Sequence, residues 1–260
     1  MSSRGAVADQ SEELGPGILE PKWWGTHLRE VRWQAELARL LADPVWRGTG
    51  LPRGDGAPVL LIPGFLAGDQ SLSVMAAWLR KVGHRPKRAG ISFNVACSDL
   101  AVDRLSKVLL HASLSSGRKV AIIGHSRGGH FARALAVRHP EQVAQVISMG
   151  SGLDQPFDIS EPTRLAVDGV RRVIARRDPE RAALGCFTHE CLCRYAADYR
   201  APFPESVPLT SLYSKGDGVV RWRACIVSYA RCVEVQGSHI GLAFNRYAYR
   251  EIAATLAPAG

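Results

Sequence analysis

The sequence predicts an α/β fold in which helices cover both faces of a mostly parallel β-sheet. Three observations predict it. From about residue 57 onward, short apolar segments of strand length alternate with longer amphipathic segments of helical period. Several of these short segments are apolar at consecutive positions, as strands buried on both faces are. A Gly-rich turn over 124–129 joins one such strand directly to a helix. Regular alternation of this kind favours a parallel, doubly wound sheet.

Length and composition suit one such domain with an insertion. The chain has 260 residues, of which 46% are apolar, so a full core can form. The net charge is +9, and 27 of the 33 basic residues are Arg. This charge fits basic side chains spread over the surface, or a peripheral contact with an anionic membrane. No helix-turn-helix, zinc-finger or RNA-binding motif accompanies it, so we expect no nucleic-acid partner.

The N-terminal part predicts a tail followed by a helix. Residues 1–20 are polar and Gly-rich, and we expect a flexible tail there. They lack the apolar stretch of a secretory signal, so we expect a cytoplasmic protein, or a secreted one if a signal was removed. Over 21–56 we expect a helical extension, with a helix from Pro21 to Trp46, and then a connection, because apolar residues recur at helical steps between Leu28 and Leu41. Four Trp residues add apolar surface, so this helix either packs on the main domain or serves as a lid or membrane-surface helix.

The main domain is predicted over 57–150 and 209–260. Its expected strands and helices follow one another in the order strand 59–62, helix 71–82, strand 88–93, helix 99–114, strand 119–123, helix 131–138, strand 143–149, strand 209–213, strand 232–235 and helix 242–256. The intervening segment 151–208 is too long for a plain loop and contains a basic helix near Arg164 to Arg177. We therefore predict that 151–208 forms a cap inserted into the sheet domain.

The turn after the strand 119–123 carries the candidate nucleophile. Gly124-His125-Ser126-Arg127-Gly128 matches the pattern G-x-S-x-G, and it lies between a strand and a helix, the context in which that pattern has meaning. The chain must reverse sharply there, which strains the Ser backbone, and the flanking glycines remove Cβ atoms that would clash. The pattern predicts that Ser126 presents its hydroxyl above the carboxyl edge of the sheet.

A Ser hydroxyl needs a base within hydrogen-bond reach, and the base needs an orienting acid. His239 is the predicted base, because it follows the last strand and precedes the last helix. Asp217, in the turn after the strand 209–213, is the predicted acid, and Asp154 is the alternative. The chain order Ser126, Asp217, His239 is the order found with this type of nucleophile turn.

Acyl transfer also needs donors for the developing oxyanion. We expect them to be the backbone N–H of Arg127 and that of Phe65, or of Leu66 in its place, since Gly64 lets this loop approach the nucleophile closely. Leu66 and His125 are the predicted substrate-binding side chains. The Phe65 ring either lines the acyl pocket or packs in the core.

With these motifs in order, the chain resembles the α/β-hydrolase superfamily, and within it the bacterial esterases and lipases, over about residues 57 to 258. The resemblance rests on Pro63-Gly64-Phe65, Gly124 to Gly129, Asp217 and Ser238-His239. It implies hydrolysis of small-molecule or lipid carboxylic esters through an acyl-enzyme, with no cofactor, and a cap that sets substrate choice. A thioesterase or acyltransferase would use the same acyl-enzyme, and a non-catalytic binding protein would use only the fold.

Two positions depart from the superfamily's usual residues. Pro63 stands where many members carry His, so the hydrogen bonding of the oxyanion loop must differ. Arg127 stands where Met or Gln is common, which places a cation beside the nucleophile. That cation would favour anionic substrates or pair with an acidic residue of the cap.

The six cysteines allow several states. None forms a CxxC pair; they lie at positions 97, 186, 191, 193, 225 and 232. Cys186, Cys191 and Cys193, with His189, are too closely spaced for a standard tetrahedral zinc site, so we predict no metal. A disulfide within the cap, or from the cap to Cys225 or Cys232, is one alternative. Buried free thiols are the other.

Overall fold

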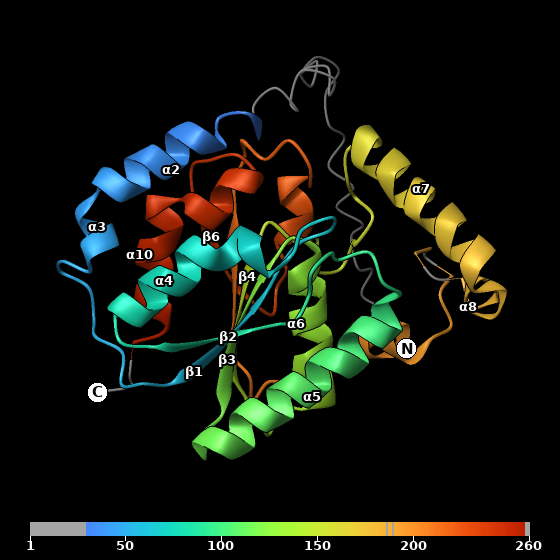
Figure 1. Cartoon of the computed structure of the whole chain (residues 1–260), viewed down its shortest axis with the longest axis horizontal. Coiled ribbons are helices and arrows are strands. Elements are labelled where there is room, and N and C mark those ends of the chain that lie inside the picture. The colour runs from blue at the N-terminus through green and yellow to red at the C-terminus, as the bar shows by residue number, and fades with distance from the viewer. Residues whose placement is uncertain (1–29, 186, 189, 258–260) are drawn as a thin grey trace, which may run out of the picture.

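The structure is a computed structural model and describes residues 30–185, 187–188 and 190–257. Six parallel strands form one sheet in the order β2-β1-β3-β4-β5-β6, with helices on both faces (Figure 1). The strands are β1 (Pro58–Ile62), β2 (Arg85–Arg88), β3 (Val120–His125), β4 (Val143–Met149), β5 (Leu209–Tyr213) and β6 (Arg231–Glu234). The predicted fold class is confirmed.

Alternate residues of the central strands serve two separate cores. On one face, Val59, Leu61 and Ile123 pack against the layer that contains α4 and α10. On the other face, Leu60 and Ile122 pack against α5 and α6. The bounds of these helices are α4 (Ser73–Lys81), α5 (Ser98–Ser116), α6 (Arg127–Arg138) and α10 (Arg246–Thr255). Burial of each such side chain stabilises the folded state by about 1.5–3 kcal/mol. The sheet with its two cores is therefore the rigid base of the molecule.

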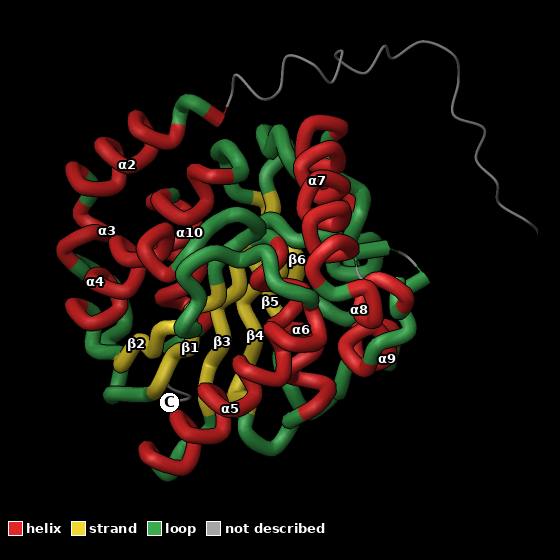
Figure 2. Tube along the Cα trace, turned by 45° about the vertical axis from the view of Figure 1, so that its right-hand side comes forward, coloured by secondary structure: helices red, strands yellow, loops and turns green. Residues whose placement is uncertain are grey.

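The N-terminal extension packs beside α4 and α10 (Figures 1 and 2). Its described part contains α2 (Trp33–Ala42) and α3 (Pro44–Arg47), separated at Asp43. Asp43 has extended backbone and its carboxylate caps α3 by accepting from Val45 N at 3.0 Å. The same carboxylate pairs with Arg250 of α10 at 2.6 Å. The expectation of one continuous helix to Trp46 is thus wrong, because Pro44 starts a new helix. Residues 21–29 of the expected helix lie outside the described residues.

Three helices lie between β4 and β5, in the segment predicted as a cap. They are α7 (Glu161–Arg177), α8 (Pro179–Ala183) and α9 (Arg194–Arg200). Helix α9 packs on α5 and α6, and the buried Arg138 of α6 donates through Nε to Asp198 of α9 at 2.7 Å. Helix α7 runs along the outside of the molecule (Figure 2). Within the described ranges, no helix has the length and apolar character needed to cross a membrane.

Two expected elements differ in their bounds. The strand expected over 88–93 lies at Arg85–Arg88, because residues 91–94 bond to the loop after β1 instead of to the sheet: Asp69 N donates to Ile91 O at 2.8 Å and Asn94 N to Ala67 O at 2.8 Å. The last helix is divided into the 3₁₀ turn η4 (Ile240–Phe244) and α10. Asn245 separates them, because its side chain caps the N-terminus of α10.

Candidate active site

Ser126 lies in a strained turn between β3 and α6. Its φ is +53° and its ψ is −124°, a backbone conformation that residues other than Gly rarely adopt. Strand β4 and the residues directly after it hold both sides of the turn, since Ser126 N donates to Met149 O at 2.8 Å and Ser126 O accepts from Ser151 Oγ at 2.7 Å. The strain expected from the G-x-S-x-G pattern is present at the expected residue.

The glycines around Ser126 are required by close backbone approach. A Cβ on Gly124 would lie 2.4 Å from Gly128 O, and a Cβ on Gly128 would lie 2.2 Å from Ile62 O. A Cβ on Gly129 would lie 2.1 Å from Ser151 Oγ. Because these glycines have no Cβ, the chain can turn this closely and α6 begins directly at Arg127. This is four residues before the predicted start of the helix, although Gly has a low helix propensity.

His239 and Asp217 form a buried pair. His239 Nδ1 lies 2.7 Å from Asp217 Oδ2, and the side chains are 6% and 1% exposed. The other carboxylate oxygen, Oδ1, accepts from Val219 N and Val220 N, each at 2.8 Å, which fixes the orientation of the carboxylate. Burial opposes the charged imidazole, but the charge and hydrogen bond of Asp217 and the charge of Glu30 outweigh it, so the pKa of His239 is raised.

The competing acid, Asp154, lies elsewhere. Its carboxylate accepts a hydrogen bond from Tyr229 Oη and borders a different cavity from the one that His239 borders. Of the two candidate acids, the structure therefore pairs Asp217 with the imidazole.

The three predicted catalytic residues gather at the carboxyl edge of the sheet. Ser126 follows β3, Asp217 follows β5 and His239 follows β6. Ser126 and His239 line one cavity of about 220 Å³, which also contacts η4 and is called the η4 cavity below. In open α/β sheets this edge is where ligands bind.

The two predicted substrate-binding side chains, Leu66 and His125, both line the η4 cavity. His125 is 7% exposed, and its Nε2 donates to His239 O at 2.9 Å. Burial, and next the charge of His239, lower the pKa of His125 to about 4, so its ring is neutral near pH 7. His125 thus holds the loop that carries the candidate base.

The two candidate oxyanion donors in the loop after β1, Phe65 N and Leu66 N, differ in their hydrogen bonding. Leu66 N donates to Asn94 O at 3.3 Å, whereas Phe65 N has no protein acceptor among the described residues. Gly64 brings this loop against the nucleophile, since a Cβ there would lie 3.1 Å from Ser126 Cβ. Phe65 is therefore the better placed of the two, and its ring borders the cavities on both sides of Ser126.

Asn94, which sequence reasoning missed, supports the loop after β1, where the candidate oxyanion donors lie. Asn94 Nδ2 donates to Pro63 O at 2.8 Å, and Asn94 is 1% exposed. Its side-chain oxygen accepts from Arg127 Nη1 at 3.1 Å. The Arg127 guanidinium also donates to Ala96 O at 2.8 Å and stacks 4.4 Å from the centre of the Phe187 ring. Asn94 and Arg127 thus join the turn at Ser126 to the loop after β1.

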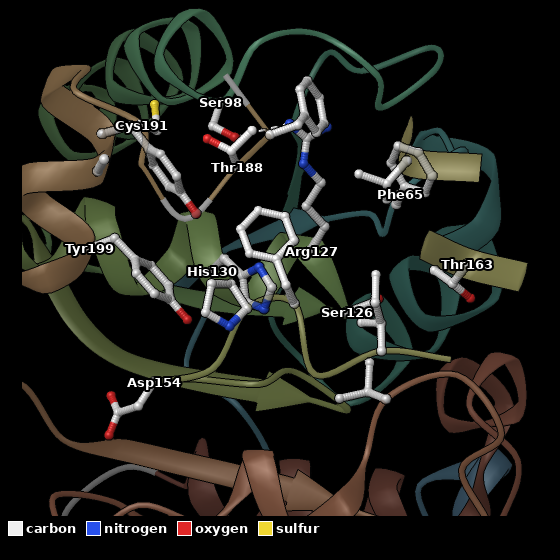
Figure 3. Close-up of a pocket in the computed structure, with 18 of the residues that line it drawn as sticks. Phe65, Ser98, Ser126, Arg127, His130, Asp154, Thr163, Thr188, Cys191 and Tyr199 are labelled. Atoms are coloured by element: carbon white, nitrogen blue, oxygen red, sulfur yellow. Dashed lines mark hydrogen bonds between the residues drawn. The ribbon is translucent and has the colours of Figure 1, made fainter. Parts of the chain in front are cut away.

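A second cavity, of about 190 Å³, lies between Ser126 and the cap helices (Figure 3). It is called the cap cavity below. Its wall is largely aromatic and aliphatic, with Phe65, Phe157, Val167, Phe187, Tyr195, Tyr199 and Val220 among its members. His130 of α6 also borders it, and within the described residues the His130 Nε2 atom has no hydrogen-bond partner. Burial, and next the charges of Arg127 and Arg133, lower the pKa of His130 to about 3, so this ring is neutral.

Cysteine thiols form part of the cap wall. Cys191 and Cys193 are buried and free, with their Sγ atoms 2.8 Å apart, and both border the cap cavity. Cys225 and Cys232 are also free, so for these four cysteines the structure shows the free-thiol alternative and not a disulfide from the cap to the sheet domain. Burial is the main cause that raises the pKa of Cys193 to about 12. Cys186 and His189, part of the weighed zinc set, lie outside the described residues.

Sequence reasoning also missed two carboxylates of the N-terminal extension. Glu30 and Glu36 lie between the apolar positions of the expected N-terminal helix, yet both accept hydrogen bonds from the loop that carries His239. No periodic pattern identifies them, because their partners lie about 200 residues further along the chain.

Comparison with known proteins agrees with this architecture. A family model described as alpha/beta hydrolase fold matches residues 92–173. The structure of the mature Bacillus licheniformis lipase BlEst2 superposes with a TM-score of 0.58 at 14% identity, covering 80% of this chain and 95% of that one. The pyrethroid hydrolase PytH superposes with a TM-score of 0.50 at 16% identity, covering 77% and 97%. No curated protein sequence matches the chain. At these identities the likeness establishes the fold.

Proposed function

We propose that the chain belongs to the α/β-hydrolase superfamily, whose fold it has, and that it is a serine hydrolase that cleaves small carboxylic esters. One observation carries the proposal. A buried imidazole held by a carboxylate at 2.7 Å borders the same cavity as a serine in a strained strand-to-helix turn. The similar structures are named as a lipase and a pyrethroid hydrolase, which supports ester hydrolysis as the reaction type.

The proposed reaction proceeds through an acyl-enzyme. The Ser126 hydroxyl attacks the ester carbonyl while His239 Nε2 accepts its proton, and Asp217 stabilises the imidazolium through Nδ1. The backbone N–H groups of Phe65 and Arg127 bind the oxyanion of the tetrahedral intermediate. His239 then protonates the leaving alcohol. In the second half, water attacks the acyl group, His239 takes its proton, and Ser126 is released.

Two cavities meeting at Ser126 support a small substrate. The cap cavity and the η4 cavity measure about 190 and 220 Å³. An apolar cavity of about 150 Å³ holds one benzene ring, so each side has room for a group of roughly one ring or a short chain. We propose that the acyl and alcohol parts of the ester divide between them. This size favours an esterase over a lipase for long-chain lipids.

The first test is covalent labelling. A fluorophosphonate probe should label the wild-type protein and fail to label Ser126→Ala, because only an activated serine hydroxyl attacks phosphorus at a useful rate. Labelling of the Ala variant at wild-type level, or no labelling of either protein, would contradict the proposal.

The second test is a chain-length series of p-nitrophenyl esters from acetate to palmitate, run with matching thioesters and with added alcohols as acceptors. We expect kcat/KM to be highest for acyl groups of about two to eight carbons, and oxyesters to be preferred. Preference for thioesters would instead favour a thioesterase, and transfer to the added alcohols an acyltransferase. A maximum at palmitate would contradict the proposed substrate size.

A further inference from the structure

Two carboxylates from the N-terminal extension hold the loop that carries His239. Glu36 of α2 accepts from Ser238 N and from Ser238 Oγ, each at 2.9 Å. Glu30, which precedes α2, accepts from His239 N at 2.9 Å and from Ile240 N at 2.8 Å. Three consecutive residues of the loop thus donate to carboxylates of a segment about 200 residues earlier in the chain.

Glu30 also reaches the loop that carries the acid. Its Oε1 atom accepts from Gly218 N at 3.1 Å, next to Asp217, and the same atom accepts from His239 N. Glu30 is 7% exposed. A buried carboxylate is stable only when donors satisfy it, and here three backbone N–H groups do so. One oxygen atom therefore joins the two loops whose relative position sets the distance between Asp217 and His239.

The charge of Glu30 has a direct effect on the candidate base. His239 faces Asp217 from the β5 side, Glu30 from the N-terminal extension and the neutral His125 from the end of β3, and Glu36 reaches it through Ser238. The pKa of His239 is raised because Asp217 and then Glu30 outweigh the effect of burial. Glu30 therefore has two effects. Its hydrogen bonds join the N-terminal extension to the loop of His239, and its charge stabilises the imidazolium that forms during proton transfer.

We propose that Glu30 is a positioning residue of the active site. It aligns His239 by binding the loop that carries this residue, and its negative charge favours the charged imidazole. Glu36 supports the same loop. This inference rests on the proposed function. By this inference, the N-terminal extension contributes to catalysis as well as to the packing of the fold.

The test compares Glu30→Gln with the wild-type enzyme. Gln keeps the shape and an acceptor oxygen but removes the charge. We expect kcat to fall about 10- to 100-fold with KM little changed, because misplacement of a reacting group costs up to that much. We also expect the acid limb of the kcat/KM profile to move to lower pH, since loss of a negative charge lowers the pKa of His239.

Further variants separate positioning from simple folding. Glu30→Asp keeps the charge and should hold the acid limb closer to its wild-type position. Glu36→Gln should lower kcat with a smaller shift of the limb, because its carboxylate bonds to Ser238 and not to His239. Glu141→Gln is the matched control, since Glu141 is exposed and far from the site, and it should change nothing. Thermal unfolding checks that each variant is folded.

A titration of the His239 imidazole by NMR gives a readout that needs no substrate. A lower pKa in Glu30→Gln supports the inference even if the wild-type protein cleaves no ester, in which case only the proposed function fails. An unchanged His239 pKa, or an unchanged kcat in a folded and active Glu30→Gln enzyme, overturns it. If Glu30→Gln does not fold, kcat of Glu30→Asp and Glu36→Gln decides: the shortened carboxylate and the lost one should each lower kcat, and wild-type kcat in both folded variants would overturn the proposal.

Discussion

Replacing Asp217 by Asn should nearly abolish turnover, for a reason that follows from the hydrogen bonds around the carboxylate. In the wild type, Oδ1 accepts from two backbone donors, Val219 N and Val220 N, and Oδ2 faces His239 Nδ1. An Asn side chain must keep its single oxygen toward the two N–H donors. Its NH₂ group is therefore forced toward Nδ1, which must then act as an acceptor. The imidazole proton moves to Nε2, and the ring can no longer accept the proton of Ser126.

The magnitude is about 10⁴ in kcat, which corresponds to roughly 5.4 kcal/mol of transition-state stabilisation. The assay is steady-state hydrolysis of p-nitrophenyl butyrate by Asp217→Asn, with the thermal unfolding temperature as the measure of folding. Asp154→Asn serves as the control, because Asp154 bonds to Tyr229, and it should retain near-normal kcat. Near-normal kcat in Asp217→Asn, or a large loss in Asp154→Asn alone, would refute the reasoning and transfer the role to Asp154.

Three other substitutions test separate parts of the site. Gly128→Ala places a Cβ 2.2 Å from Ile62 O and should destabilise the fold by about 2–3 kcal/mol, a fall in Tm of roughly 4–12 °C; Gly169→Ala, in open space on α7, should leave Tm unchanged or higher. Asn94→Ala removes the bond to Pro63 O and should lower kcat by about 10-fold with little change in KM, measured by steady-state kinetics, whereas an unaltered kcat would show that Asn94 does not support the oxyanion loop. His130→Phe removes an unpartnered polar atom from the cap cavity and should shift kcat/KM toward apolar esters over hydroxylated analogues; an unchanged ratio would place the substrate elsewhere.

Local patterns predicted the sheet and the nucleophile turn well, because both depend on neighbouring residues. The predicted bounds of β4 and β5 agree with the structure, and those of β1, a continuous apolar run buried on both faces, differ by one residue. The elbow at Ser126 was predictable because its glycines are a steric requirement of the turn itself. The order of the strands also brought Asp217 and His239 to one edge.

The misplaced elements depend instead on partners far along the chain. Residues 91–94 bond to the loop after β1, about 25 residues earlier, so their apolar character indicated a strand wrongly. Asn94, Glu30 and Glu36 act through hydrogen bonds to backbone groups of distant loops. Any sequence can supply backbone N–H and C=O groups, so nothing in the partner residues signals the contact.

The bonds from Glu30 and Glu36 also bear on how a shorter version of this protein would behave. A gene trimmed to start at β1 would encode every strand and all three residues proposed to act on the ester, and an inspection of motifs would judge it complete. Its product would leave the amides of Gly218, Ser238, His239 and Ile240 without the acceptors that now hold them. We expect low turnover from the product of such a gene, and this defect would be mistaken for a wrong choice of substrate.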